Sequence, residues 1–251
     1  MDKKIRVLIV DDSTLVRQAL RAIIESDPDL EVVAEARNGR EGYDKTRVLR
    51  PDVITMDLSM PVMDGHEAVG AIMEDIPTPI IVVSSMDSKT IVRALDLGAM
   101  DFVAVTQDFE KISGDLLEKV KVASRVKPIR RMRIRPVYKK TSNNKGSATH
   151  VVALGISTGG PQALQVVLSK LPASFPATVL VVQHISPGFI HGLVEWLSLT
   201  TPLHPQIAAE GDAIKSGVIF FAPDHYHMVL EGGERIHLVE ETASRCIHIP
   251  S

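Results

Sequence analysis

The sequence has almost no cysteine: its 251 residues include only Cys246. An internal disulfide is therefore excluded, and a single cysteine suits a reducing compartment. Long apolar runs are also lacking, since none approaches the roughly 18 residues that span a bilayer, so we expect no membrane insertion. The start, MDKKIRVLIVDD, enters an apolar strand with no cleavage site and is not a signal peptide. These features predict a cytoplasmic protein.

Charge is unevenly distributed behind a net value of −3. Residues 1–124 carry 15 basic and 23 acidic side chains, residues 125–145 carry nine basic and none acidic, and residues 146–251 carry four basic and eight acidic. The simplest interpretation is two acidic domains joined by a basic linker at 125–148. This linker has two prolines, dense charge and no apolar period. Such a run typically forms a solvated tether; attraction to nucleic acid or an acidic lipid surface is the alternative, and we expect no nucleic-acid partner.

Apolar runs alternate with helix-period segments in the first part of the chain. Five strand–helix pairs in strict alternation predict a parallel sheet with helices on both faces. The expected strands are residues 5–10, 31–36, 51–57, 78–85 and 100–105, and the expected helices are residues 13–25, 39–50, 65–75, 88–98 and 108–124.

The same rhythm resumes after the linker and predicts a second α/β domain. The proline in the first turn of its first helix favours a helix start there. The expected strands are residues 150–156, 177–184, 217–224 and 227–231, and the expected helices are residues 159–171 and 188–200.

Acidic side chains follow two strands of the first domain. Asp11 and Asp12 come after the first strand and Asp57 after the third, so the carboxylates should gather at one edge of the sheet. An all-oxygen cluster of this kind suits Mg²⁺, and one aspartate oxygen could then attack a phosphoryl group. Ser84, at the end of the fourth strand, could donate a hydrogen bond to that group. The alternative is three separate solvated turn aspartates.

The joint pattern VDD, DLSMPVMDG, VVSS and LGAMDF resembles the receiver domain of bacterial two-component response regulators. The resemblance covers residues 5 to about 122 and implies a flavodoxin-like receiver within residues 1–124, with a five-stranded parallel sheet. It implies that Asp57 accepts phosphate from a histidine kinase. Asp11 and Asp12, with Asp57, would hold magnesium, and Ser84 would be the switch hydroxyl.

One segment departs from the receiver pattern. The family usually has lysine and then proline after the fifth strand, where this sequence has Val105 and Thr106. Lys111 is a poor substitute by position. Because that lysine pairs with the phosphorylated aspartate, we expect phosphorylation to persist while its readout is weakened.

GISTG, residues 155–159, fits the pattern G-x-S-x-G between a strand and a helix, the context of a nucleophile elbow presenting Ser157. Backbone N–H groups at the helix start could hold an oxyanion. A phosphate-cradling loop could use the same glycines, but the P-loop lysine is missing and Pro161 removes one donor. His184 ends the next strand, so a right-handed crossover predicts both side chains at one edge of the sheet. The alternative is a turn serine and an ordinary strand-end histidine.

The second domain resembles the chemotaxis response regulator protein-glutamate methylesterases, through GISTGGPQAL, VVQHISPGF, AAEGDAIKSGVIFFAP and His227. The resemblance implies that residues 149–251 form a partial, doubly wound α/β catalytic domain that needs no cofactor. Ser157 would attack the methyl ester of a receptor glutamate, or a glutamine amide; His184 would be the general base, and Thr158 would lie beside the oxyanion site. Phosphorylation of Asp57 would lift the receiver off the active site, and methyl-accepting chemoreceptors would be the partners.

The aspartate of the family's triad lies downstream of a region like IHIPS, and this sequence ends there. Asp212 and Asp224 remain, neither in a matching motif. We therefore expect weak or no esterase activity and a poorly stable second domain.

A receiver that binds the kinase or receptors without hydrolysis is the alternative function. A DNA-binding regulator would need a helix-turn-helix where strands are predicted. His225 and His227 are weak evidence for a metal, and we expect no zinc.

Overall fold

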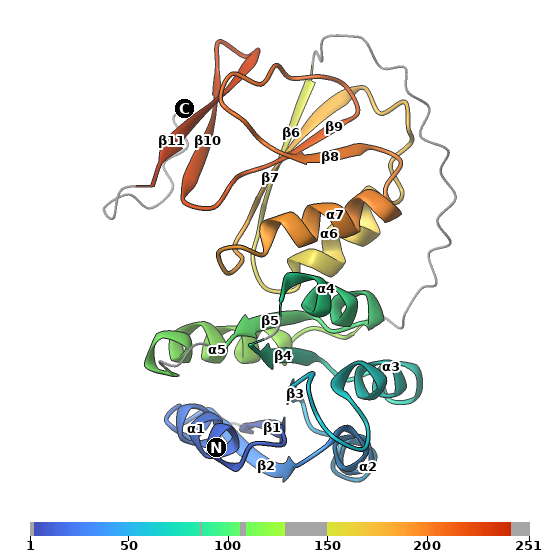
Figure 1. Cartoon of the computed structure of the whole chain (residues 1–251), viewed down its shortest axis with the longest axis vertical. Helices are drawn as coiled ribbons and strands as arrows, with labels where there is room; N and C mark the ends of the chain where they lie inside the picture. Colours follow the sequence, from blue (N-terminus) through green and yellow to red (C-terminus); the bar gives the residue numbers. More distant parts are fainter. Residues whose placement is uncertain (1–2, 86, 106–108, 129–149, 242–251) are drawn as a thin grey trace. The chain divides into compact units, whose positions relative to one another are not determined.

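The chain divides into two compact units, each with its own parallel sheet (Figure 1). No helix in the described part of the chain has an apolar stretch long enough to cross a bilayer. The computed structural model describes residues 3–85, 87–105, 109–128 and 150–241, apart from the side chains of residues 109–111. The linker beyond residue 128, Thr106, Cys246 and the side chain of Lys111 therefore lie outside the described residues.

The first unit alternates strands and helices as predicted. Its five strands form a parallel sheet in the order β2-β1-β3-β4-β5, the flavodoxin-like arrangement, so the predicted fold is confirmed. Its elements are β1 (Ile5–Val10), α1 (Thr14–Glu25), β2 (Leu30–Ala36), α2 (Gly39–Leu49), β3 (Val53–Met56), α3 (Gly65–Asp75), β4 (Ile80–Ser84), α4 (Ser88–Leu97), β5 (Asp101–Ala104) and α5 (Phe109–Ala123).

Short polar side chains cap the N-termini of helices in this unit. Ser13 accepts a hydrogen bond from the Val16 N–H at the start of α1, and Asp64 accepts from the Glu67 N–H at the start of α3. These caps satisfy backbone donors that the first helical turn leaves unpaired. The caps thereby fix where α1 and α3 begin at the carboxyl edge of the sheet.

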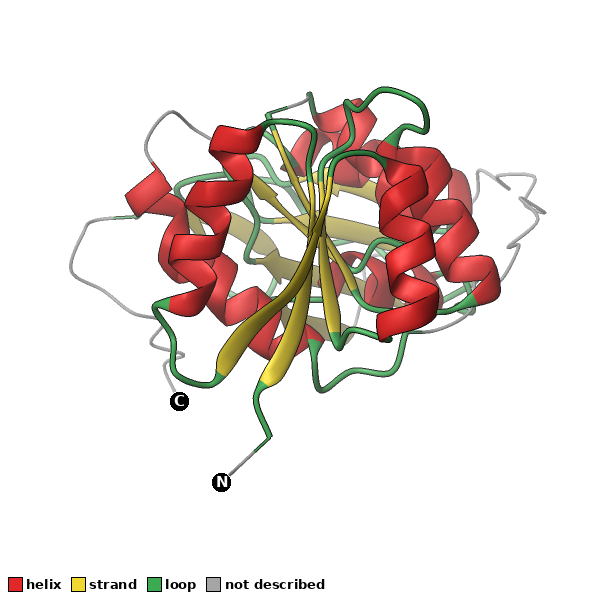
Figure 2. Cartoon of the chain, turned by 90° about the horizontal axis from the view of Figure 1, so that it is seen from below, coloured by secondary structure: helices red, strands yellow, loops and turns green. Residues whose placement is uncertain are grey.

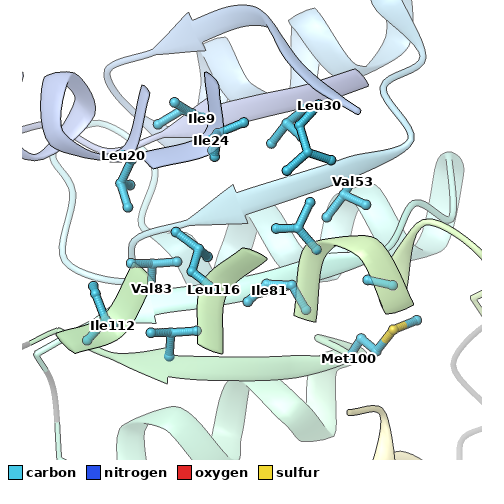
Figure 3. Packing of buried hydrophobic residues seen from close by; sticks show 14 residues of the cluster. Ile9, Leu20, Ile24, Leu30, Val53, Ile81, Val83, Met100, Ile112 and Leu116 are labelled. Atoms are coloured by element: carbon cyan, nitrogen blue, oxygen red, sulfur yellow. The ribbon is translucent and has the colours of Figure 1, made fainter. Parts of the chain in front are cut away.

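Helices cover both faces of this sheet (Figure 2), with α1 and α5 on one side and α2, α3 and α4 on the other, as labelled in Figure 1. One apolar cluster fills the space between the sheet and the pair α1 and α5 (Figure 3). Apolar residues recur three or four positions apart on α1 and α5, so one face of each helix is buried. The buried members of the cluster are Val7, Ile9, Leu20, Ile24, Leu30, Val53, Ile81, Val83, Met100, Val103, Ile112, Leu116, Val120 and Ala123.

The second unit has four parallel strands in the order β6-β7-β9-β8 and a separate antiparallel hairpin, β10-β11. As described, β6 forms one edge of the sheet and pairs only with β7; Val151 and Val152 are each 38% exposed on it. Its elements are β6 (His150–Ile156), α6 (Gly160–Leu168), β7 (Ala177–Gln183), α7 (Ile190–Thr200), β8 (His204–Ile207), β9 (Val218–Phe221), β10 (Tyr226–Glu231) and β11 (Arg235–Glu240).

The hairpin packs its apolar side against the second sheet. Met228 on β10 and Ile236 on β11 join Leu180 on β7 and Phe220 on β9 in one cluster. Val179 precedes Leu180 and Phe221 follows Phe220, so their side chains point to the opposite face of the sheet. They are buried as well. Residues on both faces of β7 and β9 are therefore shielded from water.

Both helices of this unit are shorter than the sequence pattern predicts. The predicted helix at 159–171 ends at Leu168. Beyond it, the N–H groups of Lys170 and Leu171 donate to carbonyls three residues back, which is the hydrogen-bond pattern of a 3₁₀ turn. The predicted helix at 188–200 begins only at Ile190. Gly188 has φ 87°, a left-handed conformation outside an α-helix, so the chain turns there first.

Candidate functional site

The acidic edge of the first sheet brings two predicted residues together. Val10 and Met56 are paired in β1 and β3, so Asp11 and Asp57 leave the sheet side by side. The Asp57 N–H donates to the Val10 carbonyl at 2.8 Å, which continues the ladder to this level. The expected convergence at the carboxyl edge is therefore confirmed for the backbone positions.

Both carboxylate oxygens of Asp57 accept hydrogen bonds. The Ser84 hydroxyl donates to Oδ1 at 2.9 Å, and the Ser59 N–H donates to Oδ2 at 3.0 Å. Ser84 is buried at the end of β4, so its hydroxyl is held against this carboxylate. The structure thus joins the two residues that the sequence analysis singled out for phosphate and switch roles.

Asp11 is the electrostatically costly member of this edge. It is buried, and burial raises the pKa of its carboxyl to about 6; a hydrogen bond from the Ser13 N–H opposes the shift, while the charges of Asp57 and Asp12 add to it. Among the described residues, no three His, Cys, Asp or Glu side chains are grouped closely enough to hold a metal ion. The donor chemistry nevertheless fits Mg²⁺, which commonly takes one or two carboxylates and completes its shell with water.

Arg17 on α1 supports this edge and was not found by sequence reasoning. Its guanidinium donates to the carbonyls of Asp11 and Asp12 at 2.8 and 3.1 Å, and it pairs with Glu35 at 3.1 Å. Arg17 is buried in line with Leu20. The sequence did contain a signal for this role: Arg17 lies on the apolar face of a predicted helix. An arginine at such a position needs polar partners within the fold.

The loop from Asp57 to α3 is tightly built. A Cβ on Gly65 would collide with the Asp57 carbonyl oxygen and lie 2.7 Å from the Leu58 Cα, so glycine is required where α3 meets the strand end. Val62 has φ 71°, and a β-branched residue in that conformation is strained. The glycine and the strained valine both belong to the motif DLSMPVMDG.

Val105 follows β5 and is paired with Ser84 through the backbone. Its N–H donates to the Ser84 carbonyl at 3.0 Å, and its partly buried side chain packs against the apolar cluster that contains Leu116. The position where the receiver family usually has lysine therefore carries an apolar side chain adjoining β4.

The second unit places Ser157 and His184 on neighbouring strands. Ile156 and Gln183 are paired in β6 and β7, so the next residues, Ser157 and His184, leave the sheet at the same level. The His184 N–H donates to the Ile156 carbonyl at 2.8 Å. Both side chains are exposed, and no hydrogen bond links the hydroxyl to the imidazole among the described contacts. Neighbouring strands lie about 4.8 Å apart, so a rotamer change can join them.

Gln183 ties the two turns together and was also missed from the sequence. Its side-chain N–H₂ donates to the Ser157 carbonyl at 3.1 Å and to the His184 carbonyl at 2.9 Å. The Gln183 amide thereby holds the backbone carbonyls of both candidate residues, Ser157 and His184. Its Oε1 is buried and has no partner among the described atoms.

The turn after Ser157 differs from a strained nucleophile elbow. Gly159 takes the left-handed conformation, with φ 76°, whereas Ser157 is not among the described residues with positive φ. Thr158 lies between them, just before α6. Glycine absorbs the turn without side-chain strain, and the serine hydroxyl stays accessible.

The two remaining aspartates of this unit both accept backbone hydrogen bonds. Asp212 accepts from the Ala209 N–H at 2.9 Å within its own turn. Asp224 accepts from the Gly188 N–H at 2.6 Å, in the loop that His184 begins. Neither is hydrogen-bonded to His184 in the described structure.

Comparisons with known proteins agree with this layout. Residues 7–116 match the response regulator receiver domain, and residues 152–251 match the CheB methylesterase family. The fold and both matches define the class: a receiver joined to a methylesterase domain. The response regulator domain of Thermotoga maritima CheB is 42% identical and covers 50% of this chain and 100% of its own, with a TM-score of 0.48.

Curated relatives extend the match across both units. The protein-glutamate methylesterase/protein-glutamine glutaminase of Halalkalibacterium halodurans is 40% identical over 91% of this chain and 68% of its own length. That of Thermotoga maritima is 38% identical over 92% of this chain and 69% of its own. The chain belongs to the protein-glutamate methylesterase/protein-glutamine glutaminase family.

Gly65→Ala should destabilise the first unit by about 2–3 kcal/mol, because the added methyl collides with backbone at Asp57. Gly70→Ala, in the same helix, is the matched control: its nearest contact is a Leu97 methyl at 3.9 Å, and the exchange should stabilise by about 0.5–1 kcal/mol. Urea unfolding measures both. Equal effects of the two substitutions would contradict the close-approach explanation.

Asp11→Asn should raise the free energy of unfolding at pH 7 in metal-free buffer by about 1–3 kcal/mol, since the uncharged amide avoids the cost of a buried carboxylate. The pKa of Asp11 is raised on folding, so its stabilising effect is complete below about pH 4 and is lost as the pH rises through about 6. The variant should lack that decline. Asp12→Asn, at an exposed position, should change stability less; an unchanged pH profile in Asp11→Asn would refute the argument.

Proposed function

We propose that this chain is a phosphorylation-regulated chemotaxis methylesterase that hydrolyses glutamate methyl esters, and deamidates glutamines, on chemoreceptors. The observation that carries the proposal is the register of β6 and β7, which puts Ser157 and His184 at one level of one sheet edge. Family membership supports the substrate class, because the relatives are named for these two reactions.

The chemistry follows from the pair. The Ser157 hydroxyl attacks the ester carbonyl while His184 takes its proton. The C–O bond to the methoxy group then breaks as His184 returns that proton to the leaving oxygen, giving methanol and an acyl-enzyme on Ser157. Water, activated by the same imidazole, cleaves the acyl-enzyme to free glutamate. With glutamine the leaving group is ammonia. Thr158 and the backbone N–H groups at the start of α6 would face the oxyanion.

The receiver would regulate this reaction through Asp57. Its carboxylate attacks the phosphorus of a kinase phosphohistidine, the P–N bond breaks, and an acyl phosphate forms. Asp11 and Asp12, with Asp57, would hold Mg²⁺, which when bound offsets the negative charge of the phosphoryl group. The Ser84 hydroxyl, already on Asp57, would turn to the phosphoryl oxygen. The partners would be a chemotaxis histidine kinase and methyl-accepting receptors, in the cytoplasm.

A fluorophosphonate probe tests the hydrolytic site. The probe should label the wild-type chain, Ser157→Ala should abolish labelling, and His184→Gln should slow it by about 100-fold or more because the base is lost. Ser198→Ala, at a partly exposed hydroxyl on α7, should label like the wild type. Methanol release from methylated receptors should follow the same order. Labelling that survives Ser157→Ala would exclude the proposed nucleophile.

A second candidate function is an adaptor that binds the kinase or receptors without hydrolysis. It is favoured by one observation: within the described residues, no carboxylate is hydrogen-bonded to His184. Kinase binding by a chain that the probe never labels would support the adaptor.

Val105→Lys tests how well the receiver reports its phosphorylation. An ammonium next to Ser84 could pair with phosphorylated Asp57, so the gain in probe labelling on adding phosphoramidate should be several-fold larger in the variant than in the wild type. Val105→Leu keeps the apolar packing and should behave like the wild type. An equal gain in all three chains would show that valine at position 105 does not weaken the response to phosphorylation.

A further inference from the structure

Asp224 follows β9 at the same edge of the sheet as the candidate base. Val181 on β7 pairs with Phe221 on β9, and His184 and Asp224 each come three residues later on these neighbouring strands. The Ala222 N–H donates to the Val181 carbonyl at 3.0 Å, so pairing continues toward this edge. Ser157, His184 and Asp224 therefore follow three adjacent strands, β6, β7 and β9, in the described sheet (Figure 1).

The loop that begins with His184 contains a type II turn. The Phe189 N–H donates to the Ser186 carbonyl at 3.2 Å, with Pro187 and Gly188 at the central positions and Gly188 at φ 87°. Type II requires a positive φ at the second central residue, and proline favours the first. Type I differs from type II mainly by a rotation of the peptide between these two residues.

The Asp224 carboxylate bonds to that rotating peptide. Its Oδ2 accepts the Gly188 N–H at 2.6 Å, a short charge-assisted hydrogen bond that favours the type II orientation. Asp224 is itself held in a turn, in which the Tyr226 N–H donates to the Pro223 carbonyl and His225 has φ 65°.

The backbone around His184 is restrained on three sides. Its N–H bonds to Ile156, its carbonyl accepts from Gln183, and its loop is closed by Asp224 at Gly188. No described side chain holds the imidazole itself, so these backbone contacts determine where the ring can point. We infer that Asp224 is a positioning residue for His184, acting through the 186–189 turn; this inference rests on the proposed function.

The test compares Asp224→Ala and Asp224→Asn in the full chain, with Asp212→Ala as the matched control, since Asp212 also accepts one backbone N–H. The rate of fluorophosphonate labelling should fall about tenfold in Asp224→Ala, because the base is displaced. The amide oxygen of an asparagine can still accept the Gly188 N–H, so Asp224→Asn should label within about twofold of the wild type. Asp212→Ala should be unchanged, and urea midpoints should agree across the set.

Hydrogen exchange at the Gly188 amide gives a readout that does not need activity. Exchange should speed up in Asp224→Ala and stay slow in Asp224→Asn. Wild-type labelling rates or unchanged Gly188 exchange in Asp224→Ala would overturn the inference. So would an equal loss in both variants, which would mean that the charge acts on His184 directly. Failure of the wild-type chain to label at all would instead contradict the proposed function, while amide exchange would still decide whether Asp224 holds the turn.

Discussion

Parallel strand pairing is the constraint on which both sites depend. In a parallel sheet, residues at matched positions of neighbouring strands leave the sheet together and at the same edge. The pairing of β1 with β3 delivers Asp11 beside Asp57, and the pairing of β6 with β7 delivers Ser157 beside His184. A shift of one residue in either pair would turn side chains to the opposite face and separate these groups.

The two edges use their side chains in different electrostatic regimes. At the first, the buried carboxylate of Asp11 feels the negative charges of Asp57 and Asp12, and the backbone carbonyls of the turn are held by the guanidinium of Arg17. The second carries a hydroxyl and an imidazole on an exposed turn that backbone and amide hydrogen bonds shape. Charge repulsion is thus concentrated at the first edge, whereas the arrangement at the second edge depends on hydrogen-bond geometry.

Sequence periodicity was sufficient for the architecture but not for the supports of the sites. Apolar runs ending in aspartate, serine or histidine located the strands and the residues at their ends. The strands β8, with sequence HPQI, and β11, with sequence RIHLVE, were missed because proline or mixed polarity masks the apolar pattern. Gln183 was missed for another reason: its function comes from reaching two carbonyls, and those contacts depend on a pairing that only three-dimensional structure reveals.

The absence of space between Gly65 and Asp57 has a mechanical consequence. Because Gly65 has no side chain, the first residue of α3 lies directly against the peptide carbonyl of Asp57. No side-chain rotation can absorb a change in the distance between them, because backbone meets backbone at this point. The start of α3 and the main chain at residue 57 are therefore constrained to keep their relative position.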